Sequence, residues 1–351
     1  MPPPLECGVI KQSDFCGKEM EDFRIMRQYY SRLCCWFSMR EILEATDNFH
    51  GRNLIGVGCY GKVYRGFLVD GTPIAVKELC FTSVKKEQFR RIVEAIPIMT
   101  HKNLVKLIGF CVEEWDLRTR YILLSEYVDN GNLHELLHEN DVESISPLTW
   151  RIRMDIISGI AKGLAYLHED VGQKIAHKKL QSHQILLDRQ WNPKISDFVV
   201  ARLLDHTCFS SHEDMNEKED VYGFGILVLE IVSGRKPDNY DKAREEELLI
   251  WLKSMVLIKD YKQVIDSKIP QQPPLKELKR VILTALRCVD PDTQNRPKMG
   301  EVIHMLEPRD LLLSDGKDVY RQSFSLDSQD FSRQLSIKNH VSDYDLRDDD
   351  V

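Results

Sequence analysis

From Asn53 to Glu78 the chain alternates apolar and polar residues in three short runs. NLIGVG, GKVYRGF and PIAVKEL each show the period of two that is typical of a half-buried strand. Asp70-Gly71 lies between the second and third runs, where an Asp-Gly pair is a strong signal for a tight hairpin. Two further strand-like runs follow, LVKLIGFCV and YILLSEYV. The pattern therefore predicts a small antiparallel sheet in this part of the chain.

Most other apolar positions recur at helical spacing. A short helix is predicted to begin after Ser38, because Glu41 stands three residues later, as in a capping box. A second helix is predicted over about Val84 to Met99. Further helices are predicted at TWRIRMDIISGIAKGLAYLHE, at VYGFGILVLEIVSG closed by Gly234, at EEELLIWLKSMV and at LKELKRVILTALRCV. The expected fold class is α+β, with a small antiparallel-sheet lobe that carries one main helix and a larger, mostly helical lobe.

The same pattern sets the expected domain boundaries. Residues 1–37 lack a regular pattern and are predicted to be a disordered N-terminal extension. Residues 38–307 are expected to fold, with an N-terminal lobe at 38–126 and a C-terminal lobe at 127–307. Residues 308–351 are rich in serine and aspartate, and they are predicted to be a disordered tail.

Composition narrows the class of protein. With 351 residues, of which 42% are hydrophobic, the chain can bury a sizeable core. The net charge of -7 gives no general basic field, so no nucleic-acid partner is expected. The nine cysteines are odd in number and lack CxxC spacing, which is typical of reduced thiols in the cytosol. No apolar run reaches the ~18 residues of a membrane span, so we expect a soluble, cytoplasmic protein.

Cys34 and Cys35 follow several basic residues and could form an acylation site. Acylation would attach the protein peripherally to the plasma membrane. Two unmodified thiols are the simpler interpretation, because the motif is so short. Membrane association is therefore expected only if these cysteines are acylated.

A GxGxxG motif, IGVGCYG at residues 55–61, lies between two predicted strands. Glycines let backbone N–H groups approach phosphates closely, and Val63 just beyond can cover an aromatic ring. A dinucleotide site would need the motif between a strand and a helix, so the Rossmann interpretation fails. The next strand carries Ala75-Val76-Lys77. Each feature also occurs without a ligand, but the combination favours a phosphate site.

The stretches FSMREILEATDNF, HKNLVKLIGFC, SEYVDNGNLHELLH, DVYGFG and DPDTQNRPKMGEVIHML together resemble plant receptor-like kinases and their cytoplasmic relatives over about residues 37–307. The resemblance implies the bilobal protein-kinase fold and a cleft for ATP with Mg²⁺. Lys77 would reach the phosphates, while Val63, Ala75 and Leu186 would enclose the adenine. The nucleotide-binding residues that the resemblance implies are Ile55, Gly56, Gly58, Gly61, Val63, Ala75, Lys77, Ser125, Glu126, Val128 and Leu186.

Several catalytic residues of that family are missing. The family's loop H-R-D-I-K-x-x-N is here HKKLQSHQ, residues 177–184. Lys179 stands where an Asp would accept the proton of the substrate hydroxyl, and an ammonium has no lone pair to offer. Gln181 replaces the lysine that neutralises the transferring phosphoryl group. Ile92 stands where a helix Glu would pair with Lys77, so Lys77 is expected to lack its usual partner.

The metal ligands are kept only in part. Asp197 of Asp197-Phe198-Val199 can bind Mg²⁺, although valine replaces the glycine of the family motif. Gln184 carries its amide oxygen one methylene farther out than the family's Asn, and Mg²⁺ tolerates poor geometry badly. Asp197 and Asp220 are only 23 positions apart, so the segment that would hold a peptide substrate is short and lacks Ala-Pro-Glu. Arg296, which would pair with that Glu, is expected to find water or another carboxylate.

These substitutions favour a catalytically impaired kinase-like protein, a pseudokinase with no intact catalytic set. It would keep an ATP-type cleft with weakened Mg²⁺ binding and act as a signalling scaffold or regulator of other protein kinases or receptor complexes. The alternative is an ATP-dependent protein serine/threonine kinase with weak residual phosphotransfer, with Asp197 and Gln184 holding the metal. A third interpretation is a marginally stable product of a gene that has lost part of the segment before Asp220.

Overall fold

The computed structural model describes residues 35–307, with gaps at 59, 81–84, 96–98, 116–117, 140–147, 173, 206–212 and 238–241. The chain divides after Leu306 into two compact units. Apart from Glu307, the second unit lies outside the described residues, and so does the predicted tail. Most of the predicted N-terminal extension, with Cys34 and the side chain of Cys35, also lies outside them.

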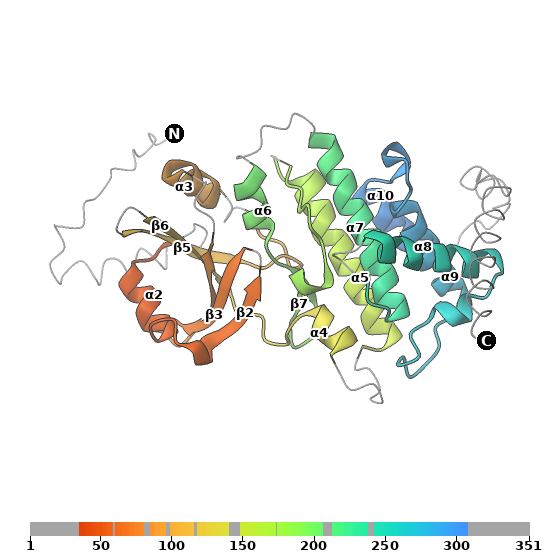
Figure 1. Ribbon diagram of the computed structural model, residues 1–351, viewed down its shortest axis with the longest axis horizontal. Coiled ribbons are helices and arrows are strands. Elements are labelled where there is room, and N and C mark those ends of the chain that lie inside the picture. The colour runs from red at the N-terminus through yellow and green to blue at the C-terminus, as the bar shows by residue number, and fades with distance from the viewer. Residues whose placement is uncertain are drawn as a thin grey trace, which may run out of the picture. The chain divides into compact units, whose positions relative to one another are not determined.

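The first lobe is a six-stranded sheet in the order β1-β5-β6-β4-β3-β2 (Figure 1). Its strands are β1 (Cys35–Trp36), β2 (Leu54–Gly58), β3 (Gly61–Phe67), β4 (Pro73–Leu79), β5 (Leu107–Trp115) and β6 (Arg118–Glu126). Neighbours are antiparallel, except that β1 runs parallel to β5. The predicted antiparallel sheet is confirmed, and Gly71 in the β3–β4 turn has the positive φ of 82° that favours glycine. β1 lies before the predicted start of the folded part at residue 38.

The two faces of this sheet have different roles. On β4, β6 and their neighbours, alternate residues point to opposite sides. Val63 pairs with Lys77 and Ala75 with Ser125, so these four side chains share one face. The other face lies under α2 (Met39–Thr46), where the predicted Ser38–Glu41 capping box is present. The apolar cluster on that side comprises Phe37, Ile42, Ile74, Val76, Cys111, Ile122 and Leu124.

The main helix of this lobe is α3 (Lys86–Ala95), which is shorter than the predicted span of Val84 to Met99. Phe89 and Val93 are fully buried, and the ring of Phe89 contacts the rings of Phe110 and Tyr121 from the sheet. α3 therefore packs on the same face as Lys77, opposite to α2.

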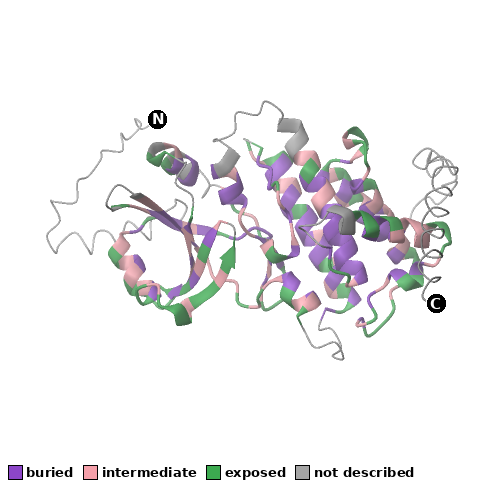
Figure 2. Cartoon of the chain, viewed as in Figure 1, coloured by how far each residue is buried: buried purple, intermediate pink, exposed green. Residues whose placement is uncertain are grey.

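The second lobe is mostly helical, and its buried residues gather along α5 and α7 (Figure 2). Its helices are α4 (Leu133–His138), α5 (Trp150–Ala165), α6 (Phe198–Asp205), α7 (Glu213–Ser233), α8 (Lys242–Leu257), α9 (Leu275–Cys288) and α10 (Met299–Leu306). A small hairpin of β7 (Ile185–Leu187) and β8 (Pro193–Ile195) completes it. Within the described part of the chain, no helix combines the length and apolar character that a bilayer crossing requires.

A charged pair lies inside this lobe and joins three segments. Arg153 of α5 is fully buried, and its Nη2 lies 2.6 Å from Asp266 Oδ2. The same guanidinium donates to the carbonyl oxygens of Leu148 and Ile231. Burial lowers the pKa of Arg153, and the Asp266 carboxylate opposes that shift. Gly234 ends α7, as predicted, at a φ of 64°, where an added Cβ would meet Asp266 Cγ at 2.5 Å.

The short segment between Asp197 and Asp220 differs from the sequence-based expectation. It forms α6 at one end, and α7 begins at Glu213 instead of the predicted Val221. Phe198, Val199, Val200 and Leu203 of α6 are buried and belong to the main apolar cluster. α6 contacts α3, so it lies between the first lobe's main helix and the helical lobe (Figure 1).

Candidate functional site

The glycines of the β2–β3 hairpin have two different environments. Gly61 has a φ of 142°, and an added Cβ would lie only 1.8 Å from Glu78 O, so this position requires glycine for the fold itself. At Gly58 an added Cβ would meet no described atom within 4 Å, and at Gly56 only Val63 Cβ at 4.0 Å. Gly56 and Gly58 therefore leave open space beside the hairpin, while Cys59 lies outside the described residues.

Lys77 and Asp197 join the two lobes directly. Lys77 Nζ lies 2.6 Å from Asp197 Oδ1, and the two side chains are 16% and 19% exposed. Lys77 therefore has a partner, although it is not the helix Glu of the family pattern. Ile92 occupies that helix position, is 8% exposed and belongs to an apolar cluster that includes Leu107 and Phe198.

The loop at residues 177–184 is fixed by Asp220. The Asp220 carboxylate accepts hydrogen bonds from the backbone N–H groups of His177 and Lys178, each at 2.6 Å. The His177 ring contacts Ser196 O through Nε2 at 2.8 Å. Lys178 has a φ of 65°, so the backbone turns sharply just before Lys179. The backbone just before the half-buried Lys179 is therefore fixed by hydrogen bonds.

The end of this loop offers a free acceptor. Gln184 Oε1 is buried and has no hydrogen-bond partner among the described residues. Gln184 O accepts from Ser196 N at 2.9 Å, which holds this residue beside the strand end that leads to Asp197. A buried acceptor without a partner costs free energy, and a cation or a ligand N–H would satisfy it. The donor set of Asp197 and Gln184 thus fits a Mg²⁺ ion in chemical type. Gln181 is half-buried at the start of the same short 3₁₀ turn.

Glu126, at the end of β6 where the chain passes to the second lobe, has its carboxylate bound by groups of the protein itself. Glu126 Oε1 accepts from Lys194 Nζ and from Lys106 N, both at 2.8 Å. The other expected nucleotide-binding residues on this side are only partly buried; they are Ser125, Val128 and Leu186. Ile55, on β2, is 47% exposed. In the expected nucleotide site, the sheet lobe and the helical lobe are joined by the ion pair of Lys77 and Asp197.

A polar cluster that the sequence reasoning missed lies where α4 meets α7 and the 177–184 loop. His134 and His138 of α4 lie beside the buried Glu230 of α7, and the ring of His183 stacks on that of His134 at 3.8 Å. Burial, together with the nearby His183, His138 and Lys236, lowers the pKa of His134 to about 4. The four-residue spacing of the two histidines was visible in the sequence. Their distant partner Glu230 was not.

Comparison with known proteins identifies the family. The family model for protein tyrosine and serine/threonine kinases matches residues 49–306. A probable receptor-like serine/threonine-protein kinase of Arabidopsis thaliana is 44% identical over 294 residues, which cover 78% of this chain and 67% of that protein. A putative receptor-like protein kinase of the same plant is 41% identical over 321 residues, which cover 86% and 70%.

Two solved pseudokinases have similar structures. The pseudokinase domain of BIR2, described as an immune regulator of the RLK/Pelle family, aligns with a TM-score of 0.67 and 29% identity over 77% of this chain and 83% of that one. A second pseudokinase, solved in its apo form, aligns with a TM-score of 0.64 and 26% identity over 78% and 92%. The expected bilobal kinase-like fold is thus confirmed. The chain belongs to the protein tyrosine and serine/threonine kinase family, among relatives that are plant receptor-like kinases.

Proposed function

We propose that this protein is a pseudokinase of the plant receptor-like type, which keeps an ATP-type cleft and regulates active protein kinases as a scaffold. The observation that carries the proposal is the contact of Lys77 with Asp197. Asp197 is the carboxylate that would hold Mg²⁺, and Lys77 is the cation that would hold phosphate. The two groups pair with each other, because α3 carries the apolar Ile92 where a carboxylate could have paired with Lys77.

The loop chemistry supports impaired phosphotransfer. Asp220 fixes the backbone on which Lys179 stands, so the cationic side chain replaces the base in an ordered loop. A protonated amine cannot accept the proton of an incoming hydroxyl. Loss of a general base commonly lowers rates by about 10²–10⁴-fold, and Gln181 adds the loss of a phosphoryl-neutralising charge.

The proposed partners are active protein kinases or receptor complexes. The similarity to receptor-like kinases and to a pseudokinase that is described as an immune regulator supports this class of partner. We propose a cytoplasmic location, with peripheral membrane attachment if Cys34 or Cys35 is acylated.

Nucleotide binding and phosphotransfer can be tested on the purified chain. We expect ATP to raise the melting temperature, with little further effect of Mg²⁺, because Lys77 competes with the metal for Asp197. Lys77→Ala should remove the ATP shift, whereas Lys62→Ala, the same change at an exposed lysine on β3, should leave it unchanged. Transfer from labelled ATP should be at background level. Incorporation that Lys77→Ala abolishes would contradict the proposed impairment.

A second candidate function is weak ATP-dependent serine/threonine phosphotransfer. The unpartnered Gln184 Oε1 favours it, since a metal ligand needs a free oxygen. In that case, ATP binding should depend on Mg²⁺, and Gln184→Leu should remove this dependence together with the incorporated label. ATP binding that Gln184→Leu leaves unchanged would argue against this function.

A further inference from the structure

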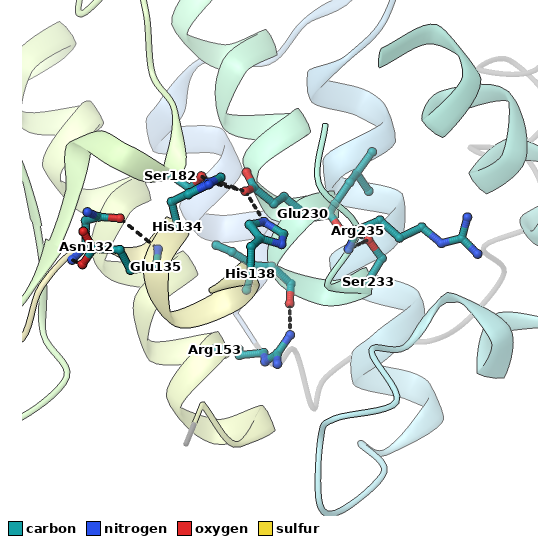
Figure 3. A network of polar contacts seen from close by, with 11 residues as sticks. Asn132, His134, Glu135, His138, Arg153, Ser182, Glu230, Ser233 and Arg235 are labelled. Atoms are coloured by element: carbon teal, nitrogen blue, oxygen red, sulfur yellow. Dashed lines mark hydrogen bonds and ion pairs between the residues drawn. The ribbon is translucent and has the colours of Figure 1, made fainter. Parts of the chain in front are cut away.

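The polar cluster of His134, His138 and Glu230 lies between α4 and α7 (Figure 3). His134 and His138 are four residues apart on α4, so both rings project from the same side of the helix. Both rings face the Glu230 carboxylate, which α7 supplies from 92 residues away in sequence.

The three side chains offer one nitrogen or oxygen atom each to a common point. His138 Nε2 lies 2.8 Å and His134 Nδ1 lies 4.0 Å from Glu230 Oε1, and all three ligand atoms lie within 4.8 Å of one another. In a tetrahedral zinc site with bonds of about 2.0–2.1 Å, ligand atoms are roughly 3.3 Å apart. The observed distances bracket that value, so small side-chain rotations are enough to enclose an ion.

These three ligand atoms belong to side chains that are almost completely buried. The side chains of Glu230, His134 and His138 are 3%, 4% and 10% exposed. A buried carboxylate is costly unless it is compensated, and here Ser182 Oγ donates to Glu230 Oε1 at 2.7 Å. Ser182 Oγ also lies 3.3 Å from His134 Nδ1, so a hydroxyl oxygen lies beside two of the three ligand atoms.

We propose that His134, His138 and Glu230 bind a divalent transition metal ion of the Zn²⁺ type. Two imidazoles and one carboxylate are ligands that Zn²⁺ accepts readily, with Ser182 or water in the fourth position. The ion displaces the proton that the contact between His138 Nε2 and Glu230 Oε1 requires. It ties α4 and the 177–184 loop to α7, and this role is independent of phosphotransfer.

The role of such a site is structural. Residues 134–138 read H-E-L-L-H, the HExxH pattern in which the Glu serves zinc hydrolases as a general base. Here Glu135 instead caps its own helix, where its Oε2 accepts from Asn132 N at 3.4 Å and its N–H donates to Asn132 Oδ1 at 3.0 Å. The carboxylate needed for hydrolysis is therefore engaged away from the metal position.

The test uses the full chain after dialysis against a chelator, with Zn²⁺ added in calorimetry and Co²⁺ as a spectroscopic probe. We expect one ion per chain, a visible Co²⁺ spectrum of tetrahedral nitrogen and oxygen ligation, and a melting temperature that rises with Zn²⁺. A thiolate charge-transfer band would assign the ion to cysteines and overturn the proposal.

His138→Gln is the decisive variant, because its amide can still donate to Glu230 while the imidazole ligand is lost. We expect zinc affinity to fall at least ~10-fold and the zinc-dependent melting shift to disappear. The matched control is His304→Ala, which removes an exposed imidazole from α10 and should leave both unchanged. Equal zinc affinity in His138→Gln and the unmodified chain, or no binding by either, would show that protons alone hold the cluster.

Discussion

Lys77 and Asp197 lie 120 residues apart in sequence, and their charged groups meet at 2.6 Å across the two lobes. Both side chains are partly exposed, so the contact is intermediate between a buried ion pair and an exposed one, which contributes little to folding stability. Removal of one partner leaves the other charge in a partly desolvated place. The pair therefore contributes to folding stability and also occupies the carboxylate that we propose as a Mg²⁺ ligand.

Asp197→Asn should lower the free energy of unfolding by about 1–3 kcal/mol, because the Lys77 ammonium loses its counter-charge. Urea titration monitored by tryptophan fluorescence measures this. Asp47→Asn is the control, since its ion pair with Arg52 is exposed and should contribute less than about 1 kcal/mol. Equal losses in the two variants would mean that the pair across the lobes is no stronger than a surface contact.

His101 should make the protein less stable in mild acid. Burial lowers its pKa below the ordinary 6.5, and the charge of Lys102 lowers it further. His101 Nδ1 also accepts a hydrogen bond from Asn103 N at 3.1 Å, which requires an unprotonated nitrogen. The unfolded chain takes up this proton more readily than the folded chain. The contribution of neutral His101 to folding stability is therefore fully present above about pH 6.5 and is lost as the pH falls toward the pKa of the folded state.

The measurement compares urea midpoints at pH 7 and pH 5 for the unmodified chain and His101→Asn. Asparagine can accept the same hydrogen bond at this position but does not titrate. We expect the variant to lose less stability over this interval. Parallel losses would assign the acid sensitivity to other groups.

At the scale of elements, α6 explains why valine stands at position 199. Asp197 has a φ of 64°, and its carbonyl oxygen accepts from Ala201 N at 3.0 Å, so the chain turns once and then coils immediately. Val199 is 6% exposed and belongs to the apolar cluster that also contains Ile92. A glycine here would remove a buried side chain from a helix that contacts α3.

Val199→Gly should therefore destabilise the protein by roughly 2–4 kcal/mol, from lost burial and from the poor helix propensity of glycine. The matched control is Val69→Gly, which makes the same chemical change at a residue that is 82% exposed. Chemical denaturation of both variants measures the difference. A loss at position 199 no larger than that at position 69 would contradict the packing role of α6.

The strands and most helices could be predicted because their signals are local. Alternation and the Asp70-Gly71 turn define the β3–β4 hairpin without reference to the rest of the chain. α6 could not be predicted from the resemblance of the sequence to receptor-like kinases, since the family motif implies glycine and a turn at position 199. The contact of α6 with α3 is a tertiary effect that the local pattern does not contain. The partner of Lys77 was likewise unpredictable, since it depends on how the lobes meet.

Across the whole molecule, the helical lobe depends on a charge network at its centre. Arg153 connects α5 to the carbonyl oxygens of Leu148 and Ile231 and to the carboxylate of Asp266. Gly234 leaves the space that this carboxylate needs. The network fixes one arrangement of three segments, because every partner is buried or nearly so.

Arg153→Met should cost about 3–5 kcal/mol, since it leaves Asp266 charged and the two carbonyl oxygens without their donor. Thermal melting, or the yield of folded protein if melting is too low to measure, provides the readout. Arg151→Met, at an exposed position of the same helix, should stay within about 0.5 kcal/mol of the unmodified chain. Similar melting temperatures for the two variants would contradict the importance of the pair.

The burial of Ile92 has a consequence for how this lineage can change. An acidic residue at position 92 of α3 would place a carboxylate among apolar side chains while Lys77 is still engaged with Asp197. Ile92→Glu alone would thus weaken the fold before a second substitution could compensate for it. A carboxylate at this position therefore requires coordinated replacements around it, so selection acting one substitution at a time would tend to preserve the apolar residue.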